Sequence, residues 1–184
     1  MKRRDRDWIL LLVMIAAAIG YGLWQGRLQH SQDGPIGVAA QRYGVEPALI
    51  KAIVWRESRF NPQARGRVGE IGLMQLGEEA AQEWADAEHI NGFAHEQCFD
   101  PVTNALAGTW YLKKLLQRYR QTDNPVPYAL ADYNAGRGNV LKWISGEAAT
   151  NSTRFIEQIA FPSTKNYIQS VMRRYARERP GYGA

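Results

Sequence analysis

The stretch from Trp55 to Leu76 reads WRESRFNPQARGRVGEIGLMQL, and it decides the expected fold and chemistry. Apolar residues recur at helical spacing just before Glu57, and Pro47 suits a first helical turn, so we expect a helix over residues 47–57. Asn61-Pro62 should stop this helix, because the residue before a proline is pushed out of the α region. Glu57 is therefore expected at the C-terminal end of an apolar helix.

A carboxyl group in this position is expected to hold its proton. The helix dipole repels negative charge at a C-terminus, and an apolar wall disfavours the charged form, so both effects raise the pKa of Glu57. A carboxyl group that stays protonated near neutral pH can act as a general acid. The alternative interpretation, from spacing alone, is that Glu57 is a solvated residue at the end of the helix.

The second half of the stretch is a loop that must turn tightly, because it contains Gly66, Gly69 and Gly72. It brings Met74 and Gln75 back toward the helix end. A glutamine amide can hydrogen-bond a sugar hydroxyl, and a methionine can pack on a sugar face. The alternative for Met74 is an ordinary core position.

Four motifs resemble the catalytic domain of the soluble lytic transglycosylases, a family related in fold to goose-type lysozyme. They are Glu57-Ser58 with Asn61-Pro62, GLMQ at 72–75, ADYNAG at 131–136, and FIEQIAF at 155–161 followed by Tyr167-Ile168. The motifs stand in the family's order, and the similarity covers residues 36–178. It implies a mainly α, lysozyme-like catalytic domain.

The resemblance also implies a reaction on peptidoglycan. Glu57 would protonate the β-1,4 glycosidic oxygen between N-acetylmuramic acid and N-acetylglucosamine. Its carboxylate would then take the proton of the muramoyl C6 hydroxyl, which attacks C1 of its own ring and leaves a 1,6-anhydro end. The residues expected to bind substrate are Ser58, Met74, Gln75, Tyr133, Asn134 and Tyr167, of which Tyr167 would also orient Glu57.

Some positions depart from the family pattern. Gly66 stands where many members have a serine, and Ala160 stands where they have a proline. Asp132 stands where alanine is more common, and it could be a second carboxylate that activates water. The alternatives are therefore a wall hydrolase of lysozyme type and a non-catalytic glycan-binding or assembly module.

The N-terminal segment predicts a transmembrane helix. Residues 8–24 carry no charge and follow a basic segment, so we expect the N-terminus in the cytoplasm and the rest of the chain in the periplasm, attached to the bacterial inner membrane by a single span. The alternative is a signal peptide cleaved near Ala16-Ala17-Ala18, with a secreted product. We expect residues 1–25 to form this anchor or signal peptide, 26–35 a linker and 179–184 a tail.

The whole chain has 184 residues, 45% of them hydrophobic, and a formal net charge of +5, which suits one domain with a sizeable core. Cys98 is the only cysteine, and no histidine has metal-ligand spacing with it, so we expect no metal and no cofactor. The expected partners are peptidoglycan glycan strands, the membrane through residues 8–24, and a protein of an envelope-spanning machine. Nothing resembles a nucleic-acid module.

Overall fold

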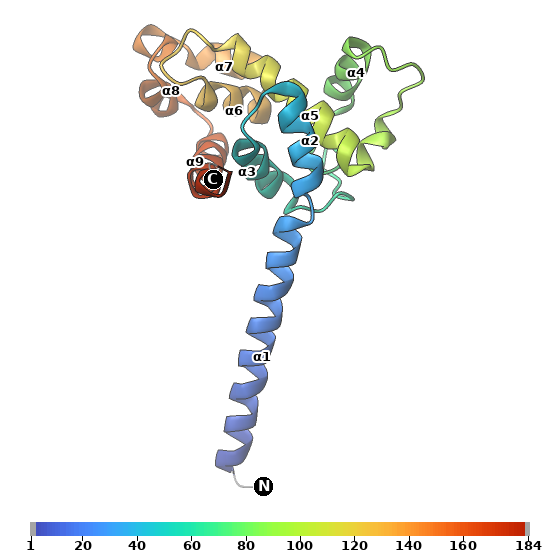
Figure 1. The fold of residues 1–184 in the computed structure, drawn as a ribbon. Helices are drawn as coiled ribbons and strands as arrows, with labels where there is room; N and C mark the ends of the chain where they lie inside the picture. Colours follow the sequence, from blue (N-terminus) through green and yellow to red (C-terminus); the bar gives the residue numbers. More distant parts are fainter. Residues whose placement is uncertain (1–2, 183–184) are drawn as a thin grey trace.

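The computed structural model describes residues 3–182, and its architecture is helical (Figure 1). Short 3-10 helices at His95–Phe99 (η1), Gly146–Ala149 (η2) and Arg179–Tyr182 (η3) join or follow the longer elements. The α-helices are α1 (Arg3–His30), α2 (Asp33–Tyr43), α3 (Pro47–Ser58), α4 (Glu78–Ala87), α5 (Pro101–Arg118), α6 (Pro125–Ala135), α7 (Arg137–Trp143), α8 (Ser152–Gln158) and α9 (Pro162–Glu178).

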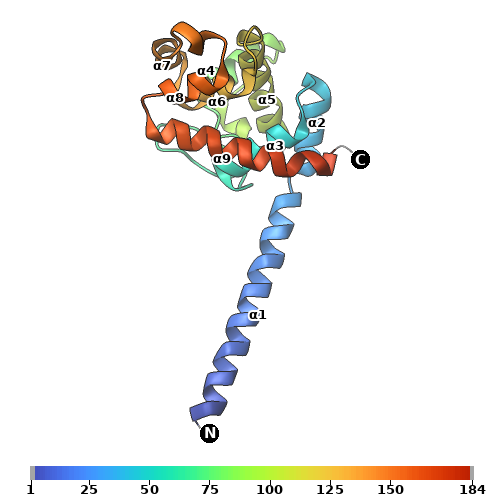
Figure 2. The ribbon, with the colours of Figure 1, turned by 90° about the vertical axis from the view of Figure 1, so that its left-hand side faces the viewer.

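Helix α1 stands away from the other helices as a long stalk (Figures 1 and 2). Its large apolar side chains are exposed, among them Trp8, Leu12 and Trp24. Within residues 3–182, it is the one helix that is long and apolar enough to cross a membrane. A signal sequence passes the same test of length and composition.

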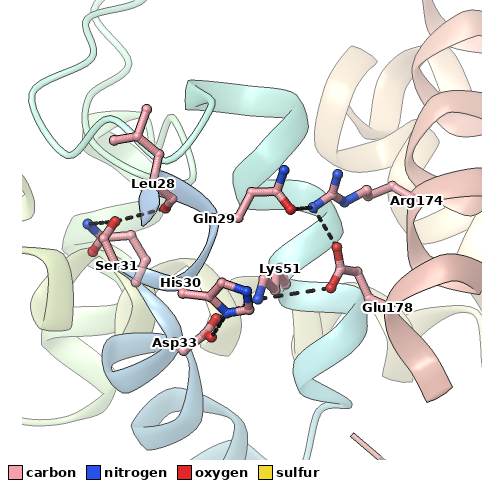
Figure 3. A network of polar contacts seen from close by, with 9 residues as sticks. Leu28, Gln29, His30, Ser31, Asp33, Lys51, Arg174 and Glu178 are labelled. Carbon is pink, nitrogen blue, oxygen red and sulfur yellow. Dashed lines mark hydrogen bonds and ion pairs between the residues drawn. The ribbon is translucent and has the colours of Figure 1, made fainter. Parts of the chain in front are cut away.

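The expected linker over residues 26–35 is mostly helical in the structure. Helix α1 continues to His30, and α2 already begins at Asp33. Residues 27–29 are arginine, leucine and glutamine, which are good helix formers. The side chain of Gln29 also accepts a hydrogen bond from Arg174 Nη2 on α9, at 2.9 Å, which fixes the last turn of α1 against the domain (Figure 3).

Helix α3 lies in the middle of the domain and packs against α2 and α9. Its apolar residues from Ala48 to Val54 are almost completely buried. Lys51 is buried among them, and its Nζ pairs with Asp33 of α2 at 2.6 Å and with Glu178 of α9 at 3.9 Å (Figure 3). Because both partners come from neighbouring helices, this buried cation ties the three helices together.

Helix α3 ends at Ser58, one residue beyond the expected end at Glu57 and before Asn61-Pro62. Arg59 and Phe60 both adopt left-handed backbone, with φ of 54° and 66°. The Arg59 N–H bonds to the Trp55 carbonyl oxygen at 3.3 Å, which closes the helix end. The chain therefore turns away directly after Glu57 and Ser58.

The loop after α3 is fastened to α5 by the buried side chain of Asn104. Its Nδ2 donates to the carbonyl oxygens of Ile71 at 3.0 Å and Cys98 at 2.9 Å, and its Oδ1 accepts from the Met74 N–H at 2.7 Å. Gly72 has φ of 79°, and a Cβ there would lie 2.4 Å from the Cys98 carbonyl oxygen, so only glycine fits. This clamp sets where Gln75 is presented.

Asn104→Ala is expected to destabilise the domain by about 3 kcal/mol, because it leaves the Met74 N–H and the Cys98 carbonyl oxygen without a partner and removes one of the two bonds to the Ile71 carbonyl oxygen. Asn139→Ala is the matched control, since the Asn139 amide makes only local contacts, donating to the Ala135 carbonyl oxygen and accepting from the exposed Lys142 Nζ. Urea unfolding measures both variants. Equal losses of stability would contradict the role of the clamp.

Candidate active site

The end of α3 opens into a cleft of about 480 Å³. Its walls come from the 66–77 loop and from α4, α5 and α6. Glu57, Gln75, Tyr133 and Asn134 all line it. Residues that are far apart in the sequence are thus brought together around one carboxyl group.

Glu57 is held in a mostly buried position by a residue of α9. The Tyr167 hydroxyl donates a hydrogen bond to Glu57 Oε1 at 2.5 Å. Burial raises the pKa of Glu57 to about 7, although the Tyr167 hydrogen bond and the Arg56 charge act to lower it. Near neutral pH the group is therefore able to give up a proton and to take one back.

Tyr167 is itself buried, and it supports Glu57 from behind the cleft. Burial and the nearby Glu57 carboxyl raise the pKa of Tyr167 well above its ordinary value. The phenol consequently stays protonated and remains a donor. The Arg56 guanidinium lies 5.3 Å from the centroid of the Tyr167 ring.

The end of α6 supplies the opposite wall of the cleft. The Tyr133 hydroxyl donates to the Met74 carbonyl oxygen at 2.8 Å and joins α6 to the loop. Asn134 Oδ1 accepts from the Thr164 hydroxyl at 3.0 Å, which leaves its amide nitrogen available as a donor. These contacts hold two polar side chains at the cleft surface.

Gln75 lies on the loop with φ of 47°, a conformation that is unusual for a residue other than glycine. Its Nε2 donates to the Gly72 carbonyl oxygen at 3.0 Å, which fixes the side-chain amide. The amide oxygen, Oε1, lies beside Gly66. The strained backbone is held by the Asn104 clamp on the neighbouring residue. A fixed amide of this kind suits recognition of a sugar substituent.

Three residues that were expected to bind substrate, Tyr167, Met74 and Ser58, are buried and are not among those that line the cleft. The Met74 side chain is completely buried against Gly108 and Thr109 of α5, where the absence of a side chain on Gly108 makes room for it. Ser58 is also buried, and its hydroxyl donates back to the Val54 carbonyl oxygen at 3.2 Å. Neither side chain lines the cleft, so this packing does not support a direct contact of Met74 or Ser58 with sugar.

Asp132 lies outside the cleft, although it had been considered as a second catalytic carboxylate. It is buried, and its Oδ2 accepts from Arg118 Nη1 at 2.5 Å and from the Tyr119 hydroxyl at 2.7 Å. Both partners belong to the end of α5. Asp132 therefore joins α5 to α6 and has no position from which to activate water in the cleft.

Glu70 and Tyr111 are among the cleft residues that were not predicted from the sequence. Glu70 lies on the loop, and its carboxylate accepts a hydrogen bond from the Val68 N–H at 3.2 Å. It occupies the space beside Gly66, where a Cβ would lie 2.1 Å from Glu70 Oε2. Tyr111 comes from α5, and its ring centroid lies 5.7 Å from that of Tyr133.

Within the described part of the chain, no three histidine, cysteine, aspartate or glutamate side chains are grouped so that they could hold a metal ion. Glu57 lines this cleft, and its raised pKa of about 7 suits proton transfer near neutral pH. A family model described as "Transglycosylase SLT domain" matches residues 34–156, more than half of the chain.

The chain belongs to the transglycosylase SLT domain family. The soluble lytic murein transglycosylase of Escherichia coli K12 is 35% identical over 130 residues, which cover 70% of this chain and 20% of the relative. The membrane-bound lytic murein transglycosylase C of Pectobacterium atrosepticum is 38% identical over 117 residues, covering 59% and 32% of the two chains. This SLT domain chain thus spans about a fifth to a third of the length of these relatives.

Solved structures of the same family have the same fold. The structure of an inactive mutant of the lytic transglycosylase Slt from Pseudomonas aeruginosa aligns with a TM-score of 0.74 at 28% identity. The alignment covers 84% of this chain and 25% of the Slt chain. The 70 kDa soluble lytic transglycosylase from Escherichia coli aligns with a TM-score of 0.72 at 28% identity, over 82% of this chain and 24% of the solved chain. The expected mainly α, lysozyme-like fold of the SLT domain is confirmed.

Glu70→Gln is expected to lower the pKa of Glu57, because the Glu70 charge acts to raise it. The Glu57 carboxyl group would then lose its proton at lower pH, so the midpoint of its NMR titration should move down. Glu79→Gln is the matched control, since Glu79 lines the same cleft without contributing to the raised pKa of Glu57. Equal shifts in the two variants would contradict this role of Glu70.

Proposed function

We propose that the chain is a peptidoglycan lytic transglycosylase, which cleaves the β-1,4 bond between N-acetylmuramic acid and N-acetylglucosamine without water. The observation that carries the proposal is the placement of Glu57. It combines a pKa of about 7, a hydrogen bond from Tyr167 and a position in a cleft lined by polar side chains. Membership of the SLT domain family supports the substrate class.

In the first step, the protonated Glu57 gives its proton to the glycosidic oxygen, and the bond from C1 of the muramoyl ring to that oxygen breaks. Tyr167 then stabilises the carboxylate that remains, because its hydrogen bond favours the charged form. In the second step, the muramoyl C6 hydroxyl attacks C1 of its own ring, and Glu57 accepts the hydroxyl proton. The enzyme returns to its starting protonation state, and the product carries a 1,6-anhydro bond.

An intramolecular nucleophile explains how one carboxyl group suffices. Most glycosidases need a second carboxylate to activate water or to attack the sugar. Here the substrate supplies a hydroxyl group that is already close to the reacting carbon, which is a proximity effect. We assign the fixing of the sugar substituents to Gln75, Tyr133 and Asn134, since they line the cleft beside Glu57.

We further propose that α1 anchors the enzyme in the bacterial inner membrane, with a single span and the catalytic domain in the periplasm. The exposed apolar helix and the membrane-bound relatives support anchoring, and secretion after cleavage of a signal peptide is the alternative. A catalytic domain attached to a short stalk suits wall remodelling or local opening of the wall for an envelope-spanning machine.

A wall hydrolase of lysozyme type is the second candidate, because Glu70 places another carboxylate in the cleft. In that reaction Glu70 would activate a water molecule, and the product would carry a reducing end. Asp132, which was considered for this task, is tied to Arg118. A non-catalytic binding module would leave the raised pKa of Glu57 without a use.

The direct test is mass spectrometry of muropeptides after purified wall is digested with the full chain in detergent. We expect 1,6-anhydromuramoyl products from the wild type and a loss of about a thousandfold in rate for Glu57→Gln, which cannot transfer the proton. The control Glu79→Gln should keep the same products. Reducing-end products would favour the hydrolase, and unchanged cleavage by Glu57→Gln would contradict the assignment of the acid.

A further inference from the structure

A second cavity, of about 890 Å³, lies where α1 meets the catalytic domain. One wall consists of Tyr21, Trp24 and Leu28 of α1, and the other includes Trp55 and Phe60 at the end of α3. It shares no lining residue with the active-site cleft among the residues that the structure describes. It is therefore a separate site on the face of the domain that is turned toward the stalk.

Positive charge collects around this junction cavity. The Arg59 guanidinium, which lines the cavity, lies 3.8 Å from the centroid of a Trp55 ring, and that of Arg174 lies 5.4 Å from the same residue's ring. Burial and the charges of Arg56 and Arg174 lower the pKa of Arg59. Such crowding of guanidinium groups favours the binding of an anion, which would relieve their repulsion.

The described side chains leave this charge partly uncompensated. Arg59 has no ion-pair partner among them. Arg174 pairs with Glu178 and donates to Gln29 of α1, which lines the cavity (Figure 3). Its Nε is a buried donor without a partner, although Arg174 itself does not line the cavity.

The backbone holds Arg59 at the cavity at a cost. Arg59 and Phe60 are consecutive residues with left-handed φ, and neither is glycine. Each such residue costs about 1–2 kcal/mol. Strain of this kind persists where the surrounding structure fixes it, and it is common at ligand sites. Here it turns a guanidinium and a phenyl ring toward the same cavity.

The position of the cavity along α1 identifies the ligand. Tyr21 and Trp24 close the apolar run of residues 8–24, and aromatic residues of this kind prefer the interface between membrane and water. If α1 anchors the protein as proposed above, the cavity lies at the level of the lipid headgroups. It then offers an apolar wall to the lipid and a guanidinium to its phosphate.

We propose that the junction cavity binds the headgroup of an anionic phospholipid, with Arg59 as the main contact to its phosphate. The inference rests on the proposed anchoring by α1, but not on the catalytic reaction. A lipid in this site bridges α1 and the end of α3, and it fixes the orientation of the catalytic domain above the membrane. The active-site cleft is then held at a constant distance from the membrane surface, on the side that faces the cell wall.

The test is native mass spectrometry of the full chain, released from vesicles of phosphatidylglycerol or of phosphatidylcholine. We expect the wild type to retain one phosphatidylglycerol and to retain phosphatidylcholine at least about tenfold less. Arg59→Asn should lose the retained lipid, and asparagine keeps the left-handed backbone accessible. Arg173→Asn on the exposed face of α9 removes the same charge outside the cavity and should retain the lipid.

Each other outcome overturns the proposal in a recognisable way. Equal retention by Arg59→Asn and Arg173→Asn would mean that general charge attraction holds the lipid. Displacement of phosphatidylglycerol by an equal concentration of inorganic phosphate would mean a phosphate site without a lipid role. Wild-type protein that stays in vesicles without lipid preference would refute the site but not the anchor, whereas protein absent from the vesicles would refute the anchor. Wall cleavage affects none of these readings, because bound lipid is weighed directly.

Discussion

The hydrogen bond from Tyr167 to Glu57 joins α9 to the buried end of α3, and the cleft is organised around it. Helix α3 is surrounded by other helices, so its last turn has little access to water and the carboxyl group of Glu57 favours its protonated form. Tyr167 offsets part of this preference. The balance gives a group that can serve as acid in one step and as base in the next.

Much of this arrangement could be predicted from the sequence. The apolar spacing before Glu57 and the family motifs placed the acid at a helix end and Gln75, Tyr133 and Asn134 close by. These predictions depend on local patterns, which survive in the folded chain. The directions of Met74 and Ser58 could not be predicted, because the space beside Gly108 and the bond to the Val54 carbonyl are properties of the packed helices.

The departures from the family pattern acquire a physical meaning in the structure. Gly66 has no side chain, and the Glu70 carboxylate fills the space that a serine would need. The two positions are therefore coupled, although nothing in the local sequence connects them. The junction with α1 is a second place where the local sequence was not sufficient. Residues 26–30 were expected to belong to a linker, but they continue helix α1, and the Arg174 contact fixes its last turn.

The central claim is that Glu57 keeps its proton near neutral pH, and the most direct measurement is its pKa. The full chain, labelled with ¹³C at glutamate side-chain carboxyl groups, can be titrated by NMR, with Glu57→Gln used to assign the signal. The account predicts a midpoint of about 7. A midpoint near the ordinary value of 4.5 would contradict it, since Glu57 would then be ionised at neutral pH and could not begin the reaction as an acid.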